Sequence, residues 1–170
     1  MVGGLGFAPA GATLSATQDL EPGSYVVFDI ESGTMAAFDV GDGQGAAKLP
    51  TPAARIEATE YEFKAAGLQV GKNPVLFDNR GREPHVIAAA PIKPGKTIED
   101  VRRYSKDEKG EDPTESEGAF ETAVLDGGVK QVIEIDLKRA GSYVLLCYVP
   151  DRAGGPPHLI KGMVSEAVVR

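Results

Sequence analysis

The sequence is poor in the residues that build most metal and disulfide sites: it has one cysteine, two histidines and no tryptophan among 170 residues. A single cysteine excludes an internal disulfide framework. It also excludes zinc fingers and iron–sulfur clusters, which several cysteines hold. Two histidines exclude any site that needs three or more imidazole ligands. No apolar run approaches the roughly 18 residues that a membrane-spanning helix needs, so no membrane span is expected.

Positive charge is also scarce. The chain has 18 Lys and Arg against 25 Asp and Glu, a formal net charge of −7, which is the wrong sign for a general nucleic-acid binder. Hydrophobic residues make up 42% of the chain, which is too many for wholesale disorder. The length suits one ordinary domain with a buried core, or such a domain plus an appendage.

Glycine and proline, in contrast, are abundant, with 21 and 12 residues. They divide the chain into short segments, which is typical of a sheet-rich fold with many turns. One short helix is expected at 97–104, where Thr97 and Asp100 form a weak capping box. Strands are expected at 24–30, 55–65, 73–79, 84–90, 130–137, 142–149 and 163–169. This spacing predicts an all-β protein, an antiparallel Greek-key β-sandwich with one short helix and an N-terminal extension.

The sandwich is expected to occupy residues 54–170, after an N-terminal extension over residues 1–53 with an extra strand or hairpin and a linker. Residues 1–18 lack the basic start and the sustained apolar core of a signal peptide. Residues 31–53 have the glycine- and proline-rich composition of turns and linkers. The acidic segment 106–118 is expected to be a solvated loop, with partner docking as the alternative.

The sequence Gly-Ser-Tyr-Val occurs twice, at 23–26 and at 141–144. One interpretation is a turn device used twice, in which a tyrosine hydroxyl ties a loop to a strand. The other is a vestigial duplicate of the sandwich. The first is favoured, because about 50 residues are too few for a second sandwich.

The only cysteine, both histidines and one of the three methionines occur in an order that suits a metal site. His85 stands at a turn-to-strand junction, and Cys147 lies near the end of the strongest predicted strand. His158 and Met163 follow Cys147 in a segment rich in proline and glycine, which must bend sharply and can return both residues toward the cysteine. One thiolate, two imidazoles and a weak axial thioether are the ligands of a mononuclear blue copper site, and they suit both oxidation states of the metal.

These motifs resemble those of the cupredoxins over about residues 55–170. Residues 79–85, Asn-Arg-Gly-Arg-Glu-Pro-His, resemble the Asn-rich turn ending in Pro-His that carries the first copper ligand in plastocyanin-like proteins. Residues 141–147 resemble the Gly-x-Tyr-x-x-x-Cys strand of the family, and 157–163 resemble its closing His-x4-Met.

The closing loop departs from that of the small electron carriers. The ten residues between Cys147 and His158 are closer to the longer loop of copper nitrite reductases. A nitrite reductase is nevertheless excluded, because its second copper needs further histidines and none remain.

The resemblance implies a protein that binds one type 1 copper ion and carries one electron, and that is not an enzyme. Its metal ligands would be His85, Cys147, His158 and, weakly, Met163. It implies a location outside the cytoplasm, periplasmic, secreted or at the cell surface. The net charge would steer a basic redox partner.

In the family the electron commonly leaves through the exposed edge of the closing-loop histidine, here His158. The surrounding apolar residues would then form a small docking patch, made of Pro156, Pro157, Leu159 and Ile160.

The alternative function is a cupredoxin-like binding or structural module, copper-delivering or copper-free, in a larger extracytoplasmic assembly. Taken singly, Cys147 and Met163 suit core positions, His85 suits a turn and His158 a surface loop. Asn79 is expected either to hydrogen-bond around the cysteine sulfur and pin the first ligand loop, as in the family, or merely to start an Asn-x-Gly turn.

Overall fold

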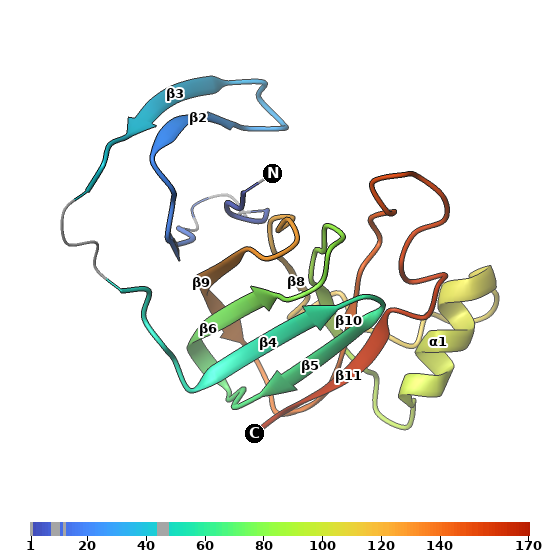
Figure 1. Ribbon diagram of the computed structural model, residues 1–170. Helices are drawn as coiled ribbons and strands as arrows, with labels where there is room; N and C mark the ends of the chain where they lie inside the picture. Colours follow the sequence, from blue (N-terminus) through green and yellow to red (C-terminus); the bar gives the residue numbers. More distant parts are fainter. Residues whose placement is uncertain (1, 8–10, 12, 44–47) are drawn as a thin grey trace.

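The structure is a computed structural model that describes residues 2–7, 11, 13–43 and 48–170. Most of the described strands form two sheets that pack face to face (Figure 1). The five-stranded sheet has the order β1 (Ala16–Gln18), β9 (Lys130–Leu137), β6 (Gly71–Asn79), β4 (Ala54–Thr59) and β5 (Glu62–Ala66). The four-stranded sheet has the order β11 (Val164–Val169), β10 (Gly141–Leu146), β7 (Ala88–Pro91) and β8 (Phe120–Glu121). The predicted all-β sandwich is therefore confirmed.

The main core lies between the sheets and follows from the two-residue period of the strands. In β4, Ile56 and Ala58 are fully buried while Arg55 and Thr59 face solvent. In β6, Val75 and Phe77 are buried on the same face. The chain changes sheet after β6, β8 and β9, which fits the predicted Greek-key connections.

Three details of the predicted strands are wrong. Residues 55–65 are not one continuous strand but the hairpin of β4 and β5, because the chain turns at Tyr61, whose φ of 67° is left-handed. The sandwich is not wholly antiparallel, because β4 and β6 pair in parallel. The strand expected at 84–90 begins only at Ala88, and the residues before it form a loop.

The single helix, α1 (Ile98–Asp107), begins as predicted. Thr97 is its N-cap: the Thr97 hydroxyl oxygen accepts from the N–H of Asp100, and the Asp100 carboxylate accepts from the N–H of Thr97. Val101 is the buried residue of the helix and packs with Val144 and Val164 on the outer face of the four-stranded sheet. The helix therefore covers a second, smaller core. Among the described residues no helix is long and apolar enough to cross a membrane.

The N-terminal region contributes to the sandwich and also leaves it. β1 pairs antiparallel with β9 at the edge of the five-stranded sheet. β2 (Gly23–Phe28) and β3 (Met35–Val40) pair with each other as a hairpin that arches away from the sheets (Figure 1). Residues 31–53 are thus not all turn and linker, since they contain β3. The division of the chain at 53/54 stays a prediction.

Both copies of Gly-Ser-Tyr-Val use their tyrosine in the same way. The Tyr25 hydroxyl donates to the carbonyl of Glu21 at 2.7 Å, and the Tyr143 hydroxyl donates to the carbonyl of Arg139 at 3.3 Å. In each case the acceptor lies four residues upstream of the tyrosine. The structure thus confirms the repeated turn device.

Candidate metal centre

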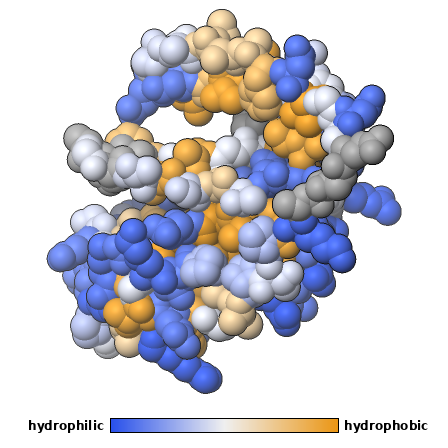
Figure 2. Space-filling model, turned by 90° about the vertical axis from the view of Figure 1, so that its left-hand side faces the viewer, coloured by the Kyte–Doolittle hydropathy of each residue, from blue (hydrophilic) through white to orange (hydrophobic). Residues whose placement is uncertain are grey.

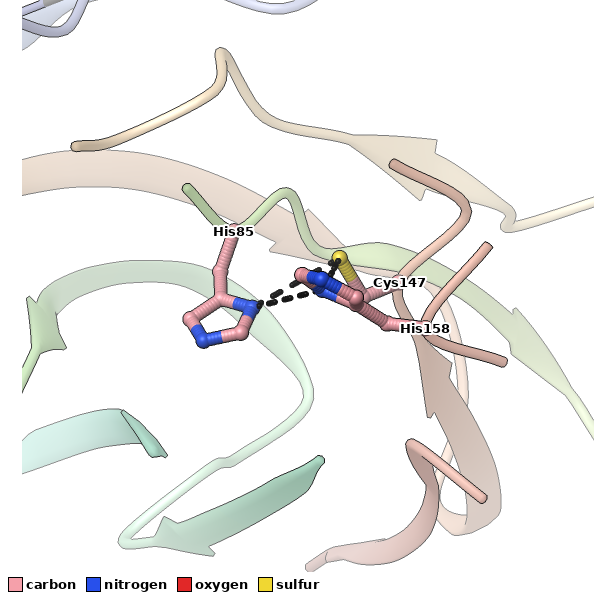
Figure 3. Close-up of side chains that lie close together, drawn as sticks. All are labelled: His85, Cys147 and His158. Carbon is pink, nitrogen blue, oxygen red and sulfur yellow. Dashed lines mark hydrogen bonds between the residues drawn. The ribbon is translucent and has the colours of Figure 1, made fainter. Parts of the chain in front are cut away.

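His85, Cys147 and His158 come together at one end of the sandwich, where loops leave the strands. Their ligand atoms all lie within 4.8 Å of one another, and all three residues are buried. Figure 3 shows the cysteine sulfur and one nitrogen of each imidazole turned toward a common point. The prediction that the fold brings these three side chains together is confirmed.

The first ligand loop is held from both sides. The backbone N–H and carbonyl of His85 form a two-way bridge with Leu125, each hydrogen bond being 2.9 Å long. The buried Asn79 side chain donates to the carbonyls of Glu83 and Leu125, and its oxygen accepts from the N–H of Gly81. Asn79 therefore both pins the loop and starts an Asn-x-Gly turn, as expected. Its side chain has no hydrogen bond to the cysteine sulfur among those of the described residues.

The closing loop folds back on the strand that carries the cysteine. Cys147 directly follows β10, and its carbonyl accepts from the N–H of Leu159 at 2.7 Å. The N–H of His158 donates to the carbonyl of Val149 at 3.0 Å, and the N–H of Met163 donates to the carbonyl of His158 at 2.9 Å. The expected sharp bend is therefore formed, and backbone hydrogen bonds fix it next to Cys147.

The three donor atoms form a compact triangle. His85 Nδ1 and His158 Nδ1 are 3.1 Å apart, and Cys147 Sγ lies 3.8 Å from the first and 3.4 Å from the second. A triangle with these edges is acute, so the point equidistant from its corners lies inside it, about 2.0 Å from each atom. Metal–nitrogen and metal–thiolate bonds in protein sites are about 2.0–2.1 and 2.3 Å long. The donor set and its spacing therefore fit a small transition-metal ion in a trigonal plane.

Burial controls the protonation of this site. Burial, followed by the charge of the nearby His158 ring, lowers the pKa of His85 to about 4. Burial also raises the pKa of the Cys147 thiol. Hydrogen bonds from the backbone N–H groups of Val86 and Val149 favour the thiolate and oppose part of this rise in pKa. A neutral imidazole is ready to bind a metal, whereas the thiol must release its proton when a metal binds.

The outer edge of His158 is closed, which contradicts the expected exposed edge. His158 is 0% exposed, and its Nε2 lies 2.9 Å from Oδ1 of Asp151. The Tyr61 hydroxyl donates to the same oxygen at 3.1 Å, and the Tyr61 ring stands edge-on to the imidazole with centroids 5.3 Å apart. Lys161 pairs with the other oxygen of Asp151. Pro156, Pro157 and Ile160 are exposed around the loop, but the ring edge they were expected to surround is not.

Asp151 and Tyr61 are thus site residues that the sequence did not reveal. Asp151 is one of 25 acidic residues and has no motif of its own. Tyr61 lies in the β4–β5 turn, within a segment whose sequence predicts one continuous strand. The orientation of His158 follows from this contact, because a proton on Nε2 that is donated to Asp151 leaves Nδ1 free to face the cysteine.

The other imidazole is enclosed differently. Nε2 of His85 is buried and has no hydrogen-bond partner among the described residues. A Cβ added at Gly81 would lie 3.2 Å from this nitrogen and 2.8 Å from a carboxylate oxygen of Glu60. A side chain at position 81 would therefore collide with the His85 ring and with Glu60, and glycine leaves room for both.

Met163 lies beside the cluster. It is fully buried in the same core as Cys147, and its carbonyl accepts from the N–H of Cys147 at 3.3 Å. The backbone thus places Met163 next to the cysteine, and its role as a metal ligand stays a prediction.

Comparison with known proteins gives a limited likeness of fold. No family model and no curated protein matches the chain. Among solved structures, a Na-dithionite reduced auracyanin from the photosynthetic bacterium Roseiflexus castenholzii is 21% identical, with a TM-score of 0.43 over 68% of this chain and 94% of that one. An auracyanin B structure is 18% identical, with a TM-score of 0.44 over 75% of this chain and 96% of that one. At these identities and TM-scores the likeness assigns neither a family nor a function to this chain, and a functional proposal must rest on the cluster itself.

Proposed function

We propose that this protein is a cupredoxin, a mononuclear type 1 copper protein that carries one electron and turns over no substrate of its own. The observation that supports this most is the triangle of His85 Nδ1, Cys147 Sγ and His158 Nδ1, whose centre lies about 2.0 Å from all three atoms. One thiolate and two imidazoles at such distances are the equatorial ligands of a blue copper site.

Copper would supply the one-electron couple, and the chain supplies donors that need not move. The His85 backbone is bridged to Leu125, and the His158 and Cys147 backbones are joined through the closing loop. Asp151 fixes the His158 ring and Asn79 fixes the loop before His85. Donors held in this way suit both oxidation states, which keeps the reorganisation between them small.

The visible spectrum tests this function. Titration of the reduced, metal-free protein with Cu(II) should give one equivalent of binding and the intense visible band of Cu–thiolate charge transfer. The Cys147→Ala variant should keep the far-ultraviolet circular dichroism of the sandwich and lose the band. A folded wild-type protein with a reduced thiol and no such band would refute the carrier, and a band retained in the variant would refute the ligand assignment.

Met163 is proposed as the weak axial ligand. The Met163→Leu variant should still bind copper and keep the charge-transfer band, but its reduction potential should rise, because a donor that favours Cu(II) is lost. Cyclic voltammetry of both proteins measures the change. Equal potentials would remove Met163 from the site.

The partner and the location are proposed on the same basis. The net charge of −7 favours a basic redox partner, because opposite charge speeds association. A location outside the cytoplasm is proposed from the resemblance of the ligand motifs to those of the cupredoxins.

One observation favours the alternative, a copper-holding or structural module. His158 is covered by Asp151 and Tyr61, so its ring offers no exposed edge to an electron acceptor. A copper-loaded protein that exchanges electrons with no small redox mediator would support the module over the carrier.

A further inference from the structure

The β2–β3 hairpin carries a surface that the sandwich does not cover. Six of its large apolar side chains are 42–85% exposed, and Figure 2 shows such residues gathered on an arm that stands apart from the body across an open gap. They are Val26, Val27, Phe28, Ile30, Met35 and Phe38. Successive side chains of a strand point to opposite faces, so Val26, Phe28 and Met35 share one face of the hairpin, and Val27 and Phe38 lie on the other. An exposed apolar face such as that of Val26, Phe28 and Met35 marks an interaction site in a soluble protein.

The hairpin is nevertheless held together by side-chain contacts of its own. Tyr25 and Phe38 stack across the strands with centroids 5.5 Å apart, and the Ser24 hydroxyl donates to Asp39 at 2.6 Å. At its tip, Asp29 accepts from the Ser32 hydroxyl and from the N–H of Glu31. Within the described part of the chain, β2 and β3 pair only with each other. A two-stranded hairpin is marginally stable alone in water, so a surface that covers its apolar side chains would stabilise it.

The charge of the chain is concentrated in the same region. No Lys or Arg precedes Lys48, whereas six carboxylates do, namely Asp19, Glu21, Asp29, Glu31, Asp39 and Asp42. These residues account for six of the seven excess negative charges. From Lys48 onward, 18 basic residues face 19 acidic ones. The long-range field of the protein therefore originates at the hairpin and its flanks rather than at the metal centre.

We propose that residues 19–43, here called the arm, dock a basic protein, with the face formed by Val26, Phe28 and Met35 at the centre of the contact and the carboxylates of the arm at the rim. An apolar centre with a charged rim is the usual construction of a protein–protein interface. The rim carboxylates would speed the encounter with a cationic surface. A second copy of this chain is a poor occupant, because its own arm is equally acidic and its body is nearly neutral.

Zero-length cross-linking locates the contact. The metal-free protein is mixed at low ionic strength with a lysine-rich cytochrome c as the basic probe, and a carbodiimide joins carboxylates to lysines in contact. All arm carboxylates fall in the tryptic peptide that ends at Lys48. We expect intermolecular cross-links from this peptide to the probe. Cross-links confined to residues 48–170, cross-links from the arm to a second copy, or none at all would each overturn the proposal.

Matched variants separate the arm from net charge. Glu21→Gln, Glu31→Gln and Asp42→Asn together remove three arm charges that have no side-chain partner among the described residues. Glu108→Gln, Glu117→Gln and Glu166→Gln remove three comparable exposed charges from the body. The arm variant should weaken binding of the probe about tenfold, within the range that steering charges give, and the body variant less than twofold. Equal effects would overturn the proposal.

The apolar part of the arm has its own test. Val26→Ser should speed dissociation of the probe severalfold with little change in the association rate, because burial acts after the encounter. An unchanged dissociation rate would reduce the contact to charge alone and overturn the proposed apolar centre. These measurements need no metal, so a negative result would not bear on the proposed copper site. In the same way, the absence of a copper spectrum would not bear on the proposed docking by the arm.

Discussion

Asp151 is the residue that most changes the character of the proposed site. Its carboxylate accepts a hydrogen bond from Nε2 of His158, the ring nitrogen that faces away from Cys147. The same carboxylate also contacts Tyr61 and Lys161. Carboxylate partners of this kind fix the ring and the tautomer of a ligating histidine and raise its basicity. The pKa of Asp151 is held below its usual value, chiefly by Lys161, so it remains a carboxylate at neutral pH.

Replacing this carboxylate should weaken metal binding without removing a ligand. We expect Asp151→Asn to lower the affinity for Cu(II) by about 10–100-fold, the usual effect of losing such a partner, and to keep the charge-transfer band. Competition with a chelator of known affinity measures the change. Asp19→Asn, a substitution of the same kind at an exposed position, serves as the control. An affinity within twofold of the wild type would show that Asp151 does not position His158.

His85 should make the metal-free protein sensitive to acid. Burial lowers its pKa from the ordinary 6.5 to about 4, so the unfolded chain binds more protons between these values. The contribution to stability is therefore complete above about pH 6.5 and is lost as the pH falls through about 4. Urea unfolding across this range, compared with His85→Gln, isolates the effect. The free energy of unfolding should fall more steeply in the wild type, and parallel curves would contradict the assignment.

At the scale of elements, the capping box of α1 is expected to matter for stability and not for the site. Thr97→Ala removes the side chain that accepts from the Asp100 N–H and should cost about 1 kcal/mol of unfolding free energy. The visible spectrum with copper should not change, because the core that the helix covers contains none of His85, Cys147 and His158. Chemical denaturation measures the loss, with the exposed Thr51→Ala as control. A loss equal to the control, or an altered spectrum, would contradict this role.

The elements also show where sequence patterns are sufficient. The alternation in 130–137 and the capping box at Thr97 are local signals, and the structure has both elements there. The sequence does not predict the β4–β5 turn because its left-handed residue is Tyr61. Glycine and asparagine are the residues that usually indicate such a conformation. β3 was missed because glycines flank it and its Met-Ala-Ala-Phe sequence is weakly typical of a strand.

At the scale of the whole molecule, the clustering of His85, Cys147 and His158 was predictable because cysteine and histidine are rare in this chain. With one cysteine and two histidines, few other arrangements were open, and the structure brings these three together. The cover over His158 was not predictable. Tyr61 and Asp151 are 90 residues apart in the sequence and meet only because the β4–β5 turn and the closing loop lie at the same end of the sandwich.

The candidate metal centre and the excess negative charge lie in different parts of the molecule. The candidate metal centre is buried in the sandwich, whereas almost all of the excess negative charge belongs to residues before Lys48. The proposed attraction of a basic partner and the burial of the centre therefore involve different parts of the chain, which can be altered independently.

X-ray absorption of the copper-loaded protein tests the central claim most directly, because it measures the metal–ligand bonds themselves. A centre built from His85, Cys147 and His158 should give two nitrogens at about 2.0 Å and one sulfur at about 2.2–2.3 Å, the lengths expected for such donors. A first shell of nitrogen and oxygen alone, with no short sulfur bond, would contradict it.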